Sequence, residues 1–244
     1  MILKLLKSFP VLAFLIRKVF MFSQNHHSPT LFLITLGLVM LVGVAEAPAQ
    51  LGSRETKEWI QNLDRPERIA GLKIDKVLPV LKLKPGDNVA DIGAGTGAFS
   101  LPFARTVAPS GKVYAVDIDP GLLDYIAQKA KKENVENIQT VKGEFSDPKL
   151  PARDVDLGFF HDVLHHIENR QAYLKALGTY IKPTGRIALI EMNRDDPKTP
   201  HRNNAEMLLS KDEVKNWMAA AGFYPSEEFD VFGNPKWFII YARR

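Results

Sequence analysis

A glycine-rich loop after a short apolar run is the feature that most constrains this chain. Residues 89–92 (Val-Ala-Asp-Ile) have the pattern of a buried strand, and three glycines follow within five positions, at Gly93, Gly95 and Gly97. Glycine adopts positive φ without steric cost and leaves the backbone amides uncovered, and the pattern beyond Gly97 is helical. A ligand can therefore lie against bare backbone at a helix N-terminus, where amide donors face it.

An acid at the end of the next apolar run completes the pattern. Residues 113–117 (Val-Tyr-Ala-Val-Asp) predict a second strand that ends at Asp117. In a parallel sheet this carboxylate lies at the same edge as the loop, where it can accept hydrogen bonds from two ribose hydroxyls. The sequence thus predicts a nucleoside-cofactor site. NAD is an open alternative, because Gly93, Gly95 and Ala98 satisfy G-x-G-x-x-G/A, although the Asp91 carboxylate suits a cationic ligand better than a pyrophosphate.

Residues 91–97 (Asp-Ile-Gly-Ala-Gly-Thr-Gly) resemble the first motif of the class I S-adenosylmethionine-dependent methyltransferases. The resemblance continues in residues 142–145 (Lys-Gly-Glu-Phe), where the family has an acid that meets the adenine amino group, and in the turn 181–186. It implies S-adenosylmethionine as cofactor, with the loop near its methionine part and Asp117 on its ribose. The residues implied to bind the cofactor are Asp91, Gly93, Ala94, Gly95, Gly97, Asp117, Ile118, Glu144 and Phe145.

The order of the expected elements agrees with an α/β fold. Alternating strands and helices imply a doubly wound, mostly parallel sheet, and the resemblance implies seven strands, a Rossmann-like methyltransferase fold and an antiparallel C-terminal edge strand. Strands are expected at 89–92, 112–117, 137–142, 155–160, 185–191, 231–233 and 236–242. Helices are expected at 55–63, in a second segment from 66 to about 81, at 98–107, from 120 onward, at 171–181 and at 211–221.

A histidine-rich segment follows the fourth expected strand and should border the cofactor crevice. Residues 161–167 read His-Asp-Val-Leu-His-His-Ile. If the segment is helical, His161 and His165 share a face with Asp162 nearby, whereas His166 points about 100° away and is structural. His161, Asp162 and His165 are therefore the candidate catalytic residues, as general bases for a protonated acceptor, with Glu191 as a further candidate. A zinc or iron site built on the same pair is the alternative, but we expect no metal.

The charge distribution and the motifs present favour a small-molecule acceptor. Residues 1–49 contain four of the 32 basic residues and one of the 28 acidic ones, which leaves 28 basic and 27 acidic residues in the rest of the chain. This near-neutral balance predicts no nucleic-acid partner. The expected reaction is methyl transfer to a small, lipophilic acceptor such as a quinone-like phenol. A non-catalytic S-adenosylmethionine-binding protein and an NAD-dependent oxidoreductase are the alternatives.

The first 49 residues have the composition of a targeting segment. Residues 31–45 are almost entirely apolar, basic residues precede them, and Ala47-Pro48-Ala49 offers the small residues of a cleavage site. We therefore expect a signal peptide or membrane anchor at 1–49 and one methyltransferase domain at 50–244. This leader would place the domain outside the cytoplasm, on the periplasmic side in a bacterium. A true start at Met21 would leave a more conventional leader, and the domain would be cytoplasmic if the leader itself is a mis-assigned start.

Overall fold

The structure is a computed structural model, and it describes residues 55–199, 202–204 and 207–243. The expected leader lies outside these residues. No helix among the described residues is both long enough and apolar enough to cross a membrane.

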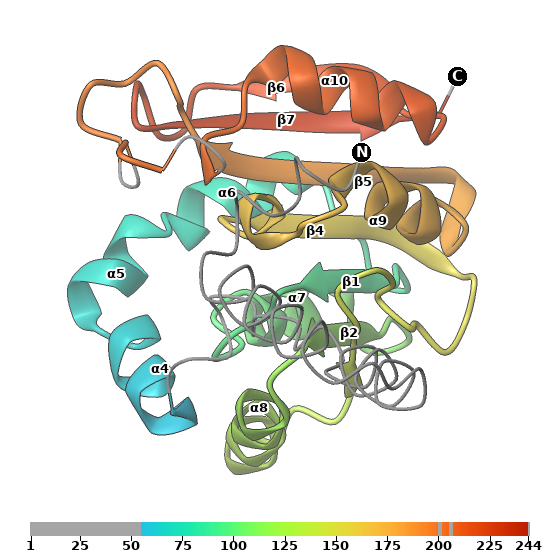
Figure 1. Cartoon of the computed structure of the whole chain (residues 1–244). Helices are drawn as coiled ribbons and strands as arrows, with labels where there is room; N and C mark the ends of the chain where they lie inside the picture. The colour runs from blue at the N-terminus through green and yellow to red at the C-terminus, as the bar shows by residue number, and fades with distance from the viewer. Residues whose placement is uncertain (1–54, 200–201, 205–206, 244) are drawn as a thin grey trace, which may run out of the picture. The chain divides into compact units, whose positions relative to one another are not determined.

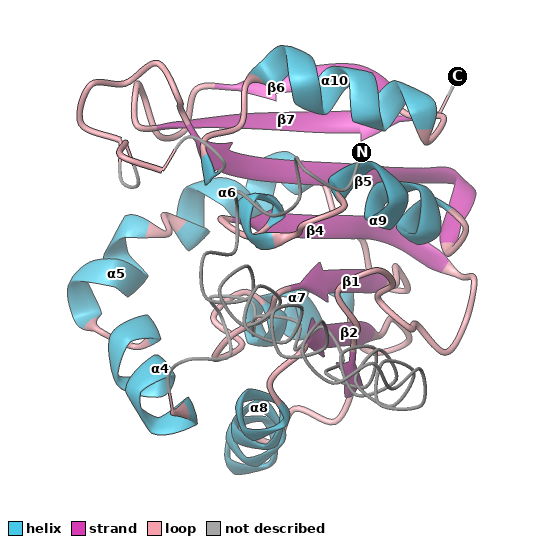
Figure 2. Ribbon diagram, in the orientation of Figure 1, coloured by secondary structure: helices cyan, strands magenta, loops and turns pink. Residues whose placement is uncertain are grey.

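A seven-stranded mixed sheet forms the centre of the fold, and its order is β3-β2-β1-β4-β5-β7-β6 (Figures 1 and 2). Strands β1 to β5 run parallel to one another, and β7 runs antiparallel to both β5 and β6. The predicted fold class is confirmed. The strands are β1 (Val89–Ile92), β2 (Val113–Asp117), β3 (Ile138–Lys142), β4 (Val155–His161), β5 (Ile181–Met192), β6 (Tyr224–Phe229) and β7 (Lys236–Ala242).

The C-terminal hairpin differs from the sequence prediction in one strand. The first strand of the pair is β6 and not residues 231–233, which lie in the turn between β6 and β7. Because β6 pairs with the outer side of β7, it forms the edge of the sheet, and the antiparallel strand β7 lies one place further in. Residues 224–229 read Tyr-Pro-Ser-Glu-Glu-Phe and do not alternate regularly between apolar and polar side chains, so the pattern predicted no strand there.

Helices cover both faces of the sheet, as the alternation of side chains along β2 shows. Tyr114 and Val116 pack with side chains of α9 and α10, whereas Val113 and Ala115 belong to the opposite face with α6, α7 and α8. The two faces are therefore both buried, which agrees with the continuous apolar runs of β1 and β2. The helices here are α6 (Ile74–Leu81), α7 (Ser100–Val107), α8 (Pro120–Lys132), α9 (Arg170–Gly178) and α10 (Lys211–Ala220).

Two short helices precede this core, α4 (Thr56–Leu63) and α5 (Pro66–Gly71). Figure 1 shows them at the side toward which the arrowheads of β1, β4 and β5 point. The sequence predicted one helical segment from 66 to about 81, but Lys73 adopts the left-handed conformation at φ 49° and ends the helical path. The chain therefore turns between α5 and α6, so that α5 lies beside the carboxyl ends of the strands.

Candidate functional site

A cavity lies at the carboxyl ends of the parallel strands, where the sheet order changes direction between β1 and β4. This is where ligands bind in open α/β sheets. Most of its walls come from five parts of the chain: the glycine loop after β1, residues 116–119, residues 143–145, residues 161–163 with 166 and 167, and side chains of the first helices, among them Trp59, Leu63 and Arg68.

The glycine loop leaves no room for side chains on its cavity side. Gly93 and Gly95 have positive φ values of 68° and 57°, and a Cβ atom at Gly93 would lie 2.5 Å from a methyl group of Val163. Ala94 lies between them in the wall of the cavity. Gly97 does not line the cavity: its φ is 73°, and a Cβ atom there would press on Leu101 and Ile126 at 3.1 Å. Gly97 therefore allows the turn and the packing of α8 beneath the loop.

Asp91 lies below this loop as a buried carboxyl group. Its Oδ2 accepts a hydrogen bond of 2.5 Å from the Ser100 hydroxyl at the start of α7. Burial raises the pKa of Asp91 to about 7, against the opposing effect of the Ser100 hydrogen bond and with a further rise from Asp117. A cation bound above the loop would favour the ionised form, so Asp91 fits the cationic ligand inferred from the sequence.

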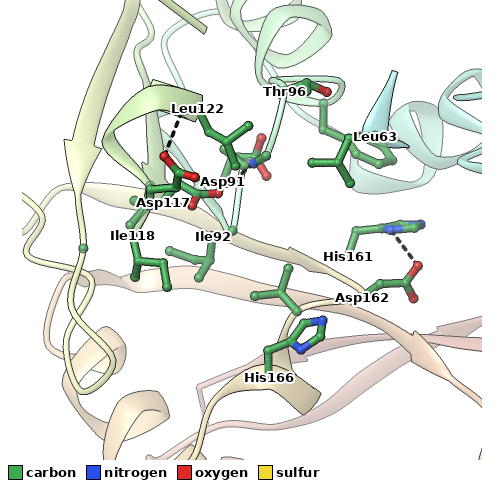
Figure 3. A pocket seen from close by; sticks show the side chains of 18 of the residues that line it. Leu63, Asp91, Ile92, Thr96, Asp117, Ile118, Leu122, His161, Asp162 and His166 are labelled. Carbon is green, nitrogen blue, oxygen red and sulfur yellow. Dashed lines mark hydrogen bonds and ion pairs between the residues drawn. The ribbon is translucent and has the colours of Figure 1, made fainter. Parts of the chain in front are cut away.

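Asp117 closes the other side of the loop. Its Oδ2 accepts a hydrogen bond of 2.9 Å from the Gly95 amide, and its Oδ1 accepts one of 3.0 Å from the Asp119 amide. Burial raises the pKa of this carboxyl, and the backbone hydrogen bonds act against that rise. Each carboxylate oxygen has a second lone pair, so Asp117 can still accept from two ligand hydroxyls. Figure 3 shows it at the end of the cavity opposite His161.

The remaining predicted cofactor residues also line the cavity. Ile118 follows Asp117, and Glu144 and Phe145 follow β3. The Glu144 carboxylate lies 3.2 Å from the Lys149 ammonium at the exposed rim, and Phe145 is 46% exposed. An exposed aromatic ring beside an acid at the mouth of a cavity can cover a flat heterocycle and pair with its amino group.

The histidine segment is not the helix that the spacing of His161 and His165 suggested. β4 continues through His161, Asp162 then adopts φ 55°, and a 3-10 turn follows at Leu164–His166. The change of direction at Asp162 separates His161 from His165. The cavity is consequently lined by His161, Asp162 and His166, whereas the sequence predicted His165 in place of His166.

His161 and Asp162 form the end of the cavity opposite Asp117, which we call the distal end (Figure 3). Arg68 also lines the cavity, close enough to both residues for their charges to influence one another. His161 Nδ1 lies 3.4 Å from Asp162 Oδ2, and the Lys236 ammonium of β7 donates to the same oxygen at 2.5 Å. Burial lowers the pKa of His161 to about 4, so the imidazole is neutral at pH 7. Burial opposes ionisation of Asp162, but His161 and Lys236 hold the pKa of its carboxyl below the ordinary value.

His165 and Glu191 form a buried pair behind the cavity wall. His165 Nδ1 lies 2.7 Å from Glu191 Oε2, and each side chain is 1% exposed. Glu191 Oε1 also accepts hydrogen bonds from the amides of Val163 and His165, at 3.1 and 3.3 Å. Neither residue lines the cavity. Their position corrects the expectation that they face the acceptor, and it indicates that they hold the 161–166 segment in place.

Two further groups at the distal end were not predicted from the sequence. Lys236 lies 74 positions from Asp162, and no local pattern connects the two. The position of His166 depends on the turn at Asp162, which the helical interpretation did not include. Within the described ranges, no group of three or more His, Cys, Asp and Glu side chains is placed to hold a metal ion.

The fold and this site define a nucleoside-binding α/β protein of the methyltransferase type, with the glycine loop and Asp117 at one end of its cavity. Residues 83–222, more than half of the chain, match the family model described as "Methyltransferase domain". The chain belongs to this family.

Known relatives agree with the assignment. A demethylmenaquinone methyltransferase of Lactobacillus johnsonii is 27% identical over 120 residues, which are 49% of this chain and 49% of the relative. The aklanonic acid methyltransferase DauC of a Streptomyces species is 36% identical over 72 residues, or 30% of this chain and 33% of the relative. The chain spans about half the length of the demethylmenaquinone methyltransferases that it matches.

A solved structure covers more of the chain. The SAM-dependent methyltransferase from Aquifex aeolicus superposes with a TM-score of 0.68 at 26% identity, over 77% of this chain and 98% of that one. The family and the site together identify S-adenosylmethionine as the cofactor. The residues fit it: the loop is bare, Asp117 has free lone pairs, and Asp91 offers a buried carboxyl to a cation.

Proposed function

We propose that this protein methylates a small, lipophilic acceptor. The observation that carries the proposal is one continuous cavity that joins the glycine loop and Asp117 to the distal end. A methyl donor and an acceptor must lie in line, and a cavity with two chemically different ends can align them. Such alignment can supply about 7–11 kcal/mol of the barrier reduction.

Residues at the two ends of the cavity have separate roles in this proposal. S-adenosylmethionine supplies an electrophilic methyl group on a positively charged sulfur. We propose that Asp117 and Ile118 hold its nucleoside, that Glu144 and Phe145 contact the adenine, and that Asp91, Gly93, Ala94 and Gly95 hold its methionine part. Gly97 acts indirectly, by letting the loop turn. We propose that His161 and Asp162 shape the acceptor site.

The apolar part of the cavity wall supports a lipophilic acceptor. Trp59, Leu63 and Leu72 come from the first helices and the turn after them, and Phe99 and Val163 extend the same surface. The names of the relatives, demethylmenaquinone methyltransferase and aklanonic acid methyltransferase, describe enzymes that act on small molecules. A nucleic-acid acceptor is not favoured, because the chain beyond residue 49 is close to neutral.

Calorimetry of the purified protein tests the cofactor half of the proposal. S-adenosylmethionine and S-adenosylhomocysteine should bind one molecule per chain, and NAD should not bind. Transfer of labelled methyl from the donor to a panel of phenols and quinols tests the acceptor half. Binding of NAD without binding of either S-adenosyl compound would contradict the proposal.

We propose membrane engagement through residues 31–45, on the support of their composition alone. Fractionation of cells and sequencing of the N-terminus of the mature protein test this. Recovery in the cytoplasm with residues 1–49 absent would instead indicate a later start of translation.

A further inference from the structure

Arg68 brings a positive charge to the distal end of the cavity. Its helix, α5, lies beside the carboxyl ends of the strands, and the side chain lines the cavity. No hydrogen bond or ion pair joins the Arg68 guanidinium to another residue in the described part of the chain. A guanidinium stays charged at all ordinary pH values, so this group presents five donors to the cavity.

Each of the two acids near Arg68 is engaged by other groups through its Oδ2 atom, and its Oδ1 atom has no hydrogen-bond partner among the described residues. Asp162 accepts a hydrogen bond from the Lys236 ammonium at 2.5 Å. Asp64 accepts one of 2.7 Å from the Tyr125 hydroxyl, and Lys129 lies 3.9 Å from the same oxygen. Burial lowers the pKa of Arg68, and neighbouring Arg65 adds to this, while Asp162 and Asp64 oppose it. When Arg68 and Lys236 are counted against Asp162, the distal end holds one more positive charge than negative charge.

His161 adds no charge to this balance. Its side chain is 5% exposed and lies between the rings of Phe99 and Phe232. The contact of Nδ1 with the Asp162 carboxylate favours the tautomer with the hydrogen on Nδ1, which leaves Nε2 as an acceptor. Nε2 is buried and has no hydrogen-bond partner among the described residues. A neutral, buried imidazole of this kind is a weak proton acceptor, so it is poorly suited to ionise an ordinary alcohol.

We infer that the distal end binds the methyl acceptor as an oxyanion, the ionised form of a phenol or enol, with the Arg68 guanidinium as its counter-ion. The inference rests on the proposed function and names the chemical class of its substrate. An acceptor that ionises readily in water arrives with its nucleophilic lone pair already free, and Arg68 favours that form in the cavity. The O–H proton leaves to solvent before binding, so no residue of the site has to remove it.

The chemistry of the two ends fits this assignment. Asp91, Asp117 and Glu144 at one end face a cationic donor, and Arg68 at the other end faces an anionic acceptor. An amine acceptor would be repelled by Arg68, and a neutral alcohol would leave the half-buried guanidinium without a counter-ion, which is unfavourable. His161 Nε2 can accept a hydrogen bond from a second polar group beside the oxyanion.

Binding of a coloured phenol tests the inference without a catalytic assay. The probe is 4-nitrophenol, whose absorbance reports its ionisation, titrated into full-length protein saturated with S-adenosylhomocysteine. The bound probe should ionise at a pH at least about one unit lower than the free probe, which is about a tenfold preference for the phenolate. The neutral analogue 4-nitroanisole should bind more weakly than the phenolate.

Arg68→Met should weaken binding of the phenolate about tenfold or more and remove the shift in ionisation. Arg68→Lys should keep part of both. The matched control is Arg65→Met, because Arg65 is exposed and its guanidinium bonds only the Asn62 carbonyl of those residues that the structure describes. Circular dichroism and unchanged affinity for S-adenosylhomocysteine establish that each variant is folded.

The outcomes separate this inference from the proposed function. If S-adenosylhomocysteine binds but the phenolate binds no better than 4-nitroanisole, or Arg68→Met binds it as well as wild type, the inference is wrong and the proposed function stands. If neither S-adenosyl compound binds, the proposed function fails, and the inference fails with it. Failure of the probe to bind at any pH also overturns the inference.

Discussion

Single residues of the site combine a structural and a binding role, and Asp117 shows this most clearly. Its carboxylate accepts hydrogen bonds from the Gly95 and Asp119 amides, and these bonds fix its orientation at the edge of the loop. Asp117→Ala removes both the orientation of the loop and the acceptors for two hydroxyls. We expect a loss of cofactor binding on the order of 2–4 kcal/mol, if each hydrogen bond contributes about 1–2 kcal/mol.

Calorimetry with S-adenosylhomocysteine measures this loss. Asp124→Ala, at an exposed position of α8, is the control and should leave affinity unchanged. Equal affinities of wild type and Asp117→Ala would show that this carboxylate does not contact the ligand.

The raised pKa of the single residue Asp91 predicts that the stability of the fold depends on pH. Its folded pKa of about 7 lies above the ordinary value, so the folded state holds the proton more tightly than the unfolded state does. The stabilising contribution is complete below about pH 4 and is lost as the pH rises through 7. Asp91→Asn cannot titrate and still offers an oxygen to the Ser100 hydroxyl.

The unfolding free energy of Asp91→Asn relative to wild type should therefore increase between pH 4 and pH 8, by on the order of 4 kcal/mol. Urea unfolding of both proteins across this range measures the difference. A difference that is the same at both pH values would mean that burial does not perturb Asp91.

At the scale of elements, the segment 161–166 is held in its conformation by β5, a strand that comes later in the sequence. Glu191, at the end of β5, accepts hydrogen bonds from two backbone amides of this segment, and its Oε2 atom lies 2.7 Å from His165 Nδ1. Glu191→Ala leaves these buried donors without an acceptor, which costs roughly 2–5 kcal/mol of stability. Glu228→Ala, in an exposed ion pair with Lys211, should change stability by less than about 0.5 kcal/mol.

Denaturant midpoints at constant m-value measure both effects. If Glu191→Ala unfolds at the wild-type midpoint, the pair does not hold the segment. A variant that keeps its stability but loses methyl transfer would instead place Glu191 in the reaction itself.

The same scale shows what the sequence could and could not predict. Local patterns predicted the glycine loop, the strand that ends at Asp117 and the helix from residue 120 onward, at whose start the Asp119 carboxylate accepts a hydrogen bond of 2.7 Å from the Gly121 amide. They did not predict the turn at Asp162, because a positive φ at a residue other than glycine has a weak local signal. The pairing of Lys236 with Asp162 depends on β7 lying beside β5, which is a property of the whole sheet.

At the scale of the whole domain, the carboxylates and Arg68 give the cavity opposite electrostatic character at its two ends. The negative end should distinguish S-adenosylmethionine from S-adenosylhomocysteine, because the two differ by the positive charge on sulfur. A cation bound near Asp91 lowers the pKa of its carboxyl below the value of about 7 in the free protein. Binding of the cation then releases a proton at pH values between these two pKa values.

The ratio of the affinities for S-adenosylmethionine and S-adenosylhomocysteine should therefore rise with pH and level off above about pH 7, where Asp91 is already ionised in the free protein. Both ligands carry the same amino and carboxyl groups, so the ionisation of these groups affects both affinities alike and cancels in the ratio. Calorimetry between about pH 5.5 and 8.5, in buffers of different ionisation enthalpy, measures both the ratio of affinities and the released proton. In Asp91→Asn the ratio should no longer depend on pH. A wild-type ratio that is constant over this range would show that the buried carboxyl does not sense the charge on sulfur.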